Sequence, residues 1–191
     1  AIMRNEWGRE IIPWVYPDRH RHCLMMNPDP QFGFSSDILG QAAELVERLP
    51  ELDGFHLDQN GYGWIDTAHD DGVTWLHDRP AYNMLLGYRR LGREFRKFCD
   101  RHGKLIESNG LIHFRQMEDA DMLMAEQSLS ALARFGPICS QRALIYLSTG
   151  EEGFQWSLKY GSFPHVSPYE WAPGPNFKMG PRTAAVYQSY L

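Results

Sequence analysis

The chain has 191 residues, of which 43% are hydrophobic and 23% are charged. This length can bury one substantial core, and the charge is too high for a membrane-embedded or disordered protein. The net charge is −5, and no strongly basic patch indicates a nucleic-acid partner. We therefore expect one domain over residues 1–191, with no nucleic acid and no membrane as partners. The sequence leaves the cellular location open.

The first third of the chain predicts the order strand, helix, strand. The apolar stretch from Ile11 to Pro17 predicts a buried strand that ends at proline. A helix is expected to begin near Ser35 or Ser36, with Ser36 as a plausible N-cap, and to stop at Pro50. Residues 52–57, Leu-Asp-Gly-Phe-His-Leu, then predict a short buried strand that runs directly into Asp58.

The middle of the chain predicts a long loop, a helix and a second strand that ends in a carboxylate. The loop over residues 59–79 is long for a strand-to-helix connection, which is typical of functional or lid-like segments. The helix is expected from near Pro80 to about residue 101, and Gly103 ends it. Residues 104–106 then form a short apolar strand that leads to Glu107.

The last third of the chain predicts two more strands. Residues 120–125 form an apolar strand that ends at Glu126, and residues 142–147 form another. The segment over residues 153–180 combines aromatic residues with prolines and glycines, and this composition predicts an ordered aromatic loop. A final helix is expected from Pro181.

Strands and helices that alternate in this way specify a parallel sheet, either a (β/α) barrel or an open doubly wound sheet. No glycine-rich dinucleotide fingerprint or Walker loop supports the doubly wound alternative. We count about five strands and four to five helices, against eight of each in ~250 residues for a complete TIM barrel. The predicted fold class is therefore α/β, a partial (β/α)8 TIM-barrel type. The first residue is not methionine and the end is abrupt, which suggests that the rest of a larger polypeptide is a further partner.

Carboxylates at the ends of neighbouring strands predict glycoside hydrolysis. In that reaction one carboxylate attacks or stabilises the anomeric carbon, and a second carboxyl group protonates the leaving oxygen. We expect Asp58 to be the nucleophile and Glu107 the acid/base, with Glu126 in reserve. The expected partner is a carbohydrate substrate, because exposed aromatic rings stack well on sugars. The candidate substrate-binding residues are His56, Gln59, Tyr62, Trp64, Trp75, Asn109 and Trp156.

The stretch Gly54-Phe55-His56-Leu57-Asp58-Gln59, preceded by Asn27-Pro28 and a helix, resembles the fourth-strand region of barrel α-glycosidases. These are the α-galactosidase and α-amylase superfamilies, with endo-α-N-acetylgalactosaminidase-like barrels as the nearest architecture. The resemblance implies that the aspartate after the fourth strand, here Asp58, is the nucleophile. It also implies that the acid/base comes from the fifth or sixth strand, here Glu107 or Glu126.

Each of these assignments has an alternative. Asp58 can instead accept hydrogen bonds from loop amides, and Glu107 can pair with Lys104 or Arg115. A second hypothesis is a metal-dependent hydrolase, which would draw its ligands from His56, Asp58, His69, Asp70 or His113. A third is a non-catalytic, sugar-binding barrel fragment. The glycosidase hypothesis itself implies no metal and no cofactor.

Overall fold

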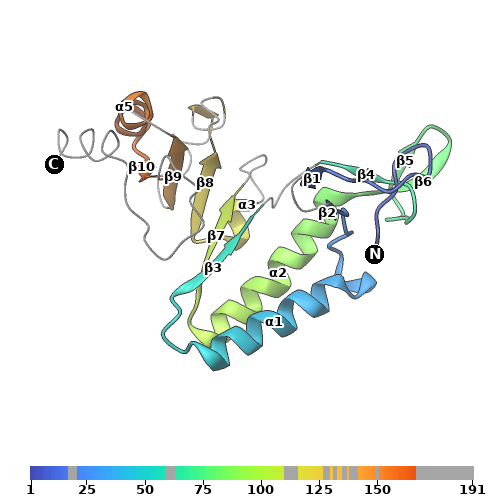
Figure 1. Ribbon diagram of the computed structural model, residues 1–191, viewed down its shortest axis with the longest axis horizontal. Helices are drawn as coiled ribbons and strands as arrows, with labels where there is room; N and C mark the ends of the chain where they lie inside the picture. Colours follow the sequence, from blue (N-terminus) through green and yellow to red (C-terminus); the bar gives the residue numbers. More distant parts are fainter. Residues whose placement is uncertain are drawn as a thin grey trace. The chain divides into compact units, whose positions relative to one another are not determined.

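The computed structural model is a mixed α/β structure with a parallel sheet (Figure 1). It describes residues 1–16, 21–58, 63–109, 116–126, 142–148 and 151–166, together with positions 130, 133, 134 and 137. Contacts divide the chain into a first unit, residues 1–55 with 60–105, and a second unit, residues 56–59 with 106–191. The division passes through the strands β3 (Gly54–Leu57) and β7 (Leu105–Asn109). The single barrel domain stays a prediction.

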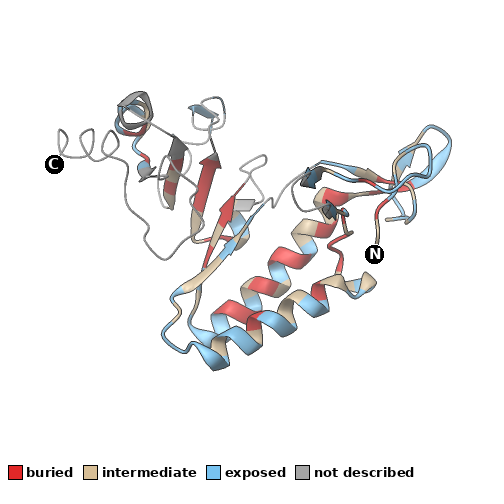
Figure 2. Cartoon of the chain, in the orientation of Figure 1, coloured by how far each residue is buried: buried red, intermediate tan, exposed pale blue. Residues whose placement is uncertain are grey.

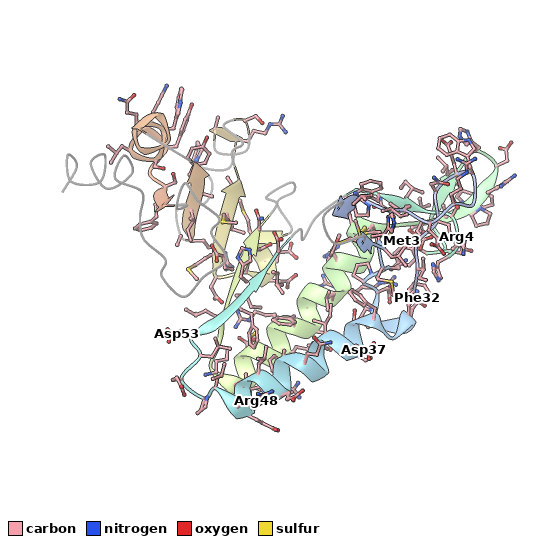
Figure 3. All side chains as sticks on the ribbon, viewed as in Figure 1. Met3, Arg4, Phe32, Asp37, Arg48 and Asp53 are labelled. Atoms are coloured by element: carbon pink, nitrogen blue, oxygen red, sulfur yellow. The ribbon has the colours of Figure 1, made fainter. Side chains whose placement is uncertain are left out.

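Two helices of the first unit confirm the two helices expected from the pattern. Helix α1 (Phe34–Arg48) begins one or two residues before the expected start, because Gly33 occupies the N-cap position, and it follows a 3-10 turn, η2 (Pro30–Phe32). Figure 3 shows Asp37 and Arg48 at opposite ends of α1, in its first and last turns. Their charges complement the partial charges of the helix termini.

Helix α2 (Met84–His102) carries a buried stripe at spacings of three and four residues (Figure 2). The buried positions are Met84, Gly87, Leu91, Gly92, Phe95, Phe98 and Cys99. The Asn83 side chain accepts a hydrogen bond from the Leu85 N–H and caps the first turn. Gly103 ends the helix as expected, in the left-handed conformation with φ of 63°.

The strand expected over residues 11–17 is only partly correct. Strand β1 (Trp14–Tyr16) pairs antiparallel with β2 (Arg21–Cys23) and stands outside the parallel sheet. The prediction that it is buried is wrong, since Val15 is 54% exposed. A two-stranded ribbon covers little of its own apolar surface. Ile11 does enter a core, which it forms with Met3, Met25 and Met84.

The long loop expected over residues 59–79 is wrong in its described part. Three short strands, β4 (Ile65–Asp66), β5 (Thr74–Leu76) and β6 (Arg79–Asn83), form an antiparallel sheet in the order β4-β6-β5. Pro80 therefore lies in a strand, and α2 begins four residues after it. Asp71 fixes this sheet by accepting hydrogen bonds from the N–H groups of Val73, Thr74 and Asn83. Strands of two to five residues are too short to give a periodic signal.

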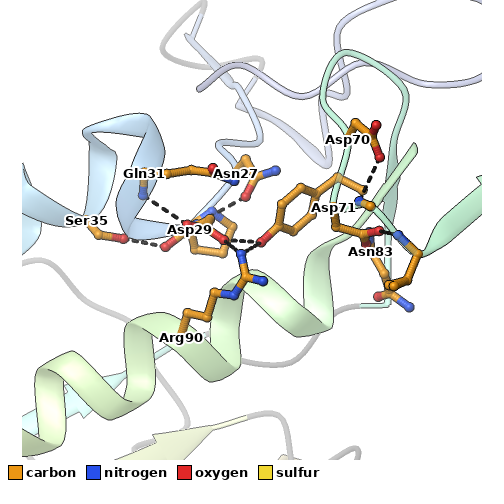
Figure 4. A network of polar contacts seen from close by, with 12 residues as sticks. Asn27, Asp29, Gln31, Ser35, Asp70, Asp71, Asn83 and Arg90 are labelled. Carbon is orange, nitrogen blue, oxygen red and sulfur yellow. Dashed lines mark hydrogen bonds and ion pairs between the residues drawn. The ribbon is translucent and has the colours of Figure 1, made fainter. Parts of the chain in front are cut away.

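A buried polar network joins the segment before α1 to β6 and α2 (Figure 4). Asp29 is 2% exposed and accepts hydrogen bonds from the Tyr82 hydroxyl, the Gln31 N–H and Arg90 Nη1. Burial by itself raises the pKa of the Asp29 carboxyl. The three hydrogen bonds together with the charge of Arg90 outweigh burial and hold this pKa below its ordinary value. Asp29 is therefore ionised where the chain leads into α1.

The second unit carries most of a sheet with the strand order β10-β9-β8-β7-β3. The further strands are β8 (Met122–Glu126), β9 (Ala143–Ser148) and β10 (Phe163–Val166), and the pairs β7–β8, β8–β9 and β9–β10 are parallel. Strands β8 and β9 confirm the expected apolar strands to within two residues. A short helix, α3 (Gln116–Asp119), precedes β8.

The aromatic loop expected over residues 153–180 is wrong in its described part. Helix α5 (Glu151–Tyr160) and strand β10 occupy residues 151–160 and 163–166, and α5 packs against β9 and β10. The aromatic residues at 156 and 160 lie one helical turn apart. This spacing is compatible with a helix, whereas the overall composition of the segment indicates a loop. The helix expected from Pro181 lies outside the described residues.

The mixed α/β class with a parallel sheet is confirmed, whereas closure into a TIM barrel stays a prediction. Of the helices that the structure describes, none combines the length and the apolar character needed to cross a membrane.

We expect Gly54→Ala to lower the free energy of unfolding by roughly 1–3 kcal/mol. A Cβ atom at this position would lie 2.4 Å from the Leu105 backbone oxygen on the neighbouring strand, so the backbone has to move. Gly40→Ala is the matched control, because its Cβ meets no atom within 4 Å and the position is exposed in α1. The control is expected to stabilise by about 0.5–1 kcal/mol. Urea unfolding measures both, and equal effects of the two changes would contradict the close approach.

We expect the protein to lose stability in acid partly through Asp29. Because its pKa is lowered in the folded state, its contribution is present above the unfolded value near 3.8 and is lost as the pH falls through the folded value. Tyr82→Phe removes one donor while Asp29 keeps Arg90 and the Gln31 N–H. Urea unfolding between pH 6 and pH 2 should give a smaller slope of stability against pH in Tyr82→Phe. An unchanged slope would contradict the contribution of the hydroxyl.

Candidate functional site

The candidate site is built on one face of β3 and β7. Successive side chains of a strand point to opposite faces, so His56 and Asp58 share a face that Phe55 does not. Phe55 packs its ring against Phe95 and Phe98 of α2, with ring centroids 5.3 and 6.1 Å apart. The polar side chains of β3 therefore lie on the face opposite to the one that carries Phe55.

Four polar side chains of the second unit come together on this face. His56 Nδ1 lies 2.9 Å from Glu107 Oε2, and His56 Nε2 lies 4.0 Å from Asp58 Oδ1. Asn109 Nδ2 donates a hydrogen bond of 2.6 Å to the same Asp58 oxygen. The two predicted carboxylates thus meet through one imidazole ring. Residue 56 contacts residue 107, and residue 58 contacts residue 109. The residue numbers increase in the same direction on both strands, as they do in a parallel pair.

Exposure rises steadily across the site. The Glu107 side chain is 19% exposed, that of His56 is 40% and that of Asp58 is 60%, while Asn109 is buried. Asp58 follows the last residue of β3 and is the outermost of the four. A ligand that approaches this end of the strands therefore reaches the Asp58 carboxylate before it reaches Glu107.

This arrangement can hold a carboxylate ready for attack at a carbon centre. The amide of Asn109 donates a hydrogen bond to one oxygen of Asp58 and so fixes the orientation of this exposed carboxylate. The structure thus gives no support to the alternative in which Lys104 pairs with Glu107, since Lys104 Nζ donates to the Pro50 carbonyl instead. The other alternative partner, Arg115, lies outside the described residues.

The remaining predicted residues fall in three places. Glu126 ends β8, the strand next to β7, and the backbone register pairs Asn109 with Met124. Trp64 and Trp75 belong to the first unit and are 37% and 66% exposed. Trp156 lies on α5, where its ring stacks on Tyr160 at 5.7 Å. Gln59 and Tyr62 lie outside the described residues.

The candidate metal ligands do not form one group among the described residues. Within that part of the chain, no three His, Cys, Asp or Glu side chains are placed to hold a metal ion. His69 instead contacts a buried carboxylate, Asp66 Oδ2, at 2.6 Å. The other donors to Asp66 are the N–H groups of Arg4 and Ala68 and the Asn27 amide. His113 lies outside the described residues.

Two features of these clusters differ from the prediction. Asn109 is predicted to bind sugar, whereas the structure shows it bound to Asp58. Asp66 has no predicted role, and it is completely buried. The sequence signal for this cluster is Asp66 at the end of a short strand, followed three residues later by His69.

No family model, no curated protein and no solved structure matches the chain.

We expect Asp66→Asn to destabilise the protein by about 2–3 kcal/mol, because an amide group would face donors in a buried site. Asp70→Asn is the control, since Asp70 is exposed and accepts one hydrogen bond from the Gly72 N–H. Thermal unfolding with and without added zinc measures both variants. A zinc-dependent rise in the melting temperature of the wild type that Asp66→Asn removes would show a ligand role instead.

Proposed function

We propose that the protein is a glycoside hydrolase-like enzyme that cleaves glycosidic bonds with two carboxylates at the carboxyl ends of parallel strands. One observation carries the proposal, namely that the exposed Asp58 carboxylate follows the end of β3 with one oxygen held by the Asn109 amide, beside neighbouring strands that carry Glu107 and Glu126. A pair of carboxyl groups on a common face is what glycoside hydrolysis requires.

The order of the strands supports a barrel rather than a doubly wound sheet. Strands β3, β7, β8, β9 and β10 are neighbours in the same order in which they occur along the chain. A doubly wound sheet reverses its order at a switch point, whereas a (β/α) barrel adds each strand beside the previous one. We therefore propose that these five strands are consecutive strands of a TIM-type barrel, whose catalytic face is at the carboxyl ends of its strands.

Asp58 is the proposed nucleophile. It is the most exposed carboxylate of the site, and the Asn109 amide holds one of its oxygens. In a retaining reaction the other carboxyl group protonates the leaving oxygen, and Asp58 forms a bond to the anomeric carbon. Water then attacks that carbon and releases Asp58, and the same acid/base group accepts the proton of the water. Glu107 and Glu126 are the two candidates for this acid/base.

Three tryptophan side chains support the proposal that the substrate is a carbohydrate. Trp156 is partly buried, stacks on Tyr160 and has Lys159 Nζ 4.5 Å from its ring centroid. Trp64 and Trp75 are exposed on the first unit. Flat apolar faces with polar neighbours suit the alternating apolar and hydroxyl surfaces of sugars. All three remain proposed sugar contacts.

The decisive experiment is hydrolysis of a panel of nitrophenyl α- and β-glycosides. We expect Asp58→Asn to lower kcat at least about 10³-fold on the best substrate, since the nucleophilic oxygen is replaced by an amide nitrogen. In Asp58→Gly, added azide should restore turnover and give a glycosyl azide. Asp100→Asn is the matched control, because the Asp100 side chain is 63% exposed, close to the 60% of Asp58.

Retained hydrolysis in Asp58→Asn would contradict the role of Asp58. Binding of sugars without cleavage by the wild type, across the whole panel, would favour the non-catalytic alternative.

A further inference from the structure

His56 lies between two carboxylates and uses a different nitrogen for each. Nδ1 is at hydrogen-bond distance from Glu107 Oε2, at 2.9 Å, and Nε2 is 4.0 Å from Asp58 Oδ1. The first distance allows a direct hydrogen bond, whereas the second allows only an electrostatic contact. His56 is therefore anchored at Glu107 and directed toward Asp58.

The proton between His56 and Glu107 belongs on the imidazole. In a hydrogen bond between an imidazole nitrogen and a carboxyl oxygen, the stronger base is the imidazole, so the carboxylate accepts. Glu107 then has no proton to give at the oxygen that faces His56. A general acid has to carry a proton in the first step of glycoside cleavage. The contact therefore conflicts with the acid/base role of Glu107.

The position of Glu107 gives an independent argument for the same conclusion. Its side chain is 19% exposed, while those of His56 and Asp58 are 40% and 60% exposed. Along β7, Glu107 precedes Asn109, and it is Asn109 that contacts Asp58. Glu107 is therefore more buried than Asp58 and lies two residues earlier in β7 than Asn109, which contacts Asp58. From this position it can hold His56 but is less accessible to a leaving group.

We propose that His56 is a positioning residue for Asp58 and that Glu107 is the anchor of His56 rather than the proton donor. This inference rests on the proposed glycosidase function and refines it. Glu107 accepts the Nδ1 proton and fixes the ring orientation of His56. In the imidazolium form His56 also carries a proton on Nε2, and this positive edge of the ring faces the same Asp58 oxygen to which Asn109 donates its hydrogen bond. The acid/base role passes to a carboxyl group on another strand, for which Glu126 on β8 is the remaining candidate.

A leaving-group experiment separates an anchor from an acid. For Glu107→Gln we expect a similar loss of kcat on a dinitrophenyl glycoside and on a glycoside with a poor leaving group, with no rescue by azide. If Glu107 were the acid, the dinitrophenyl substrate would lose little, and azide would restore turnover in Glu107→Ala. Glu94→Gln is the matched control, since Glu94 forms an ion pair with Lys97 at 2.7 Å in the first unit. It should leave both rates unchanged.

A double-mutant comparison tests whether Glu107 acts through His56. The variants are His56→Asn, Glu107→Gln and the two combined. We expect the double variant to lose no more activity than His56→Asn alone, with the loss in kcat rather than in KM. Losses that multiply would mean that Glu107 acts independently of His56 and would overturn the inference.

An NMR measurement of the His56 ring proton tests the geometry without any turnover. The His56 signals are identified by their loss in His56→Asn. We expect the proton on Nδ1 to give a low-field signal that exchanges slowly with water in the wild type and in Asp58→Asn, because Glu107 accepts its hydrogen bond, and to lose both properties in Glu107→Ala. An unchanged signal in Glu107→Ala would overturn the anchor. If no glycoside is cleaved by the wild type, the proposed function fails, yet this measurement still decides whether His56 is anchored at Glu107.

Discussion

The close pairing of β3 with β7 is the constraint on which the candidate site depends. Gly54 has no side chain, and this lets the backbone of β3 approach Leu105 more closely than a Cβ atom would permit. Once the two strands are aligned, every residue of β3 has a fixed neighbour on β7. The pairs His56 with Glu107 and Asp58 with Asn109 follow from this single register. A slip of one residue would turn all of these side chains to the other face.

The first unit combines its apolar core with a set of buried polar side chains. Asn27, Asp29, Ser35 and Asp66 are buried together with Tyr82. Burying such groups is costly unless each finds a partner. The short Asn27-Pro28-Asp29-Pro30 segment provides several of these partners, since Asn27 reaches Asp66 and Asp29 reaches both Tyr82 and Arg90. Gly87 lets α2 approach this segment closely. The network thereby ties four stretches of chain that are distant in sequence.

The elements that the sequence predicts wrongly between residues 59 and 83 share a physical cause. The strands of the β4-β6-β5 sheet have two to five residues, so a period of two cannot be recognised within them. The sequence predicts a helix that begins near Pro80, because proline is frequent in the first turn of helices. In the structure Pro80 lies in β6, the central strand of this sheet, and is paired with Trp75 of β5. Long elements with caps, such as α2 with its stop at Gly103, were predicted well because many residues contribute to one pattern.

The sequence by itself determined the alternation of strands and helices, the two helices of the first unit and the placement of Asp58 and Glu126 at strand ends. These are local properties, set by apolar periodicity, prolines, glycines and caps. The prediction that Glu107 also lies at a strand end is wrong, because β7 continues to Asn109 and Glu107 is its middle residue. Only the tertiary structure decided that Glu107 faces His56, that Asn109 holds Asp58 and that Lys104 lies elsewhere. Both contacts within the site join residues that are 51 positions apart. Such partners are fixed by strand register, and no local pattern in the sequence records that register.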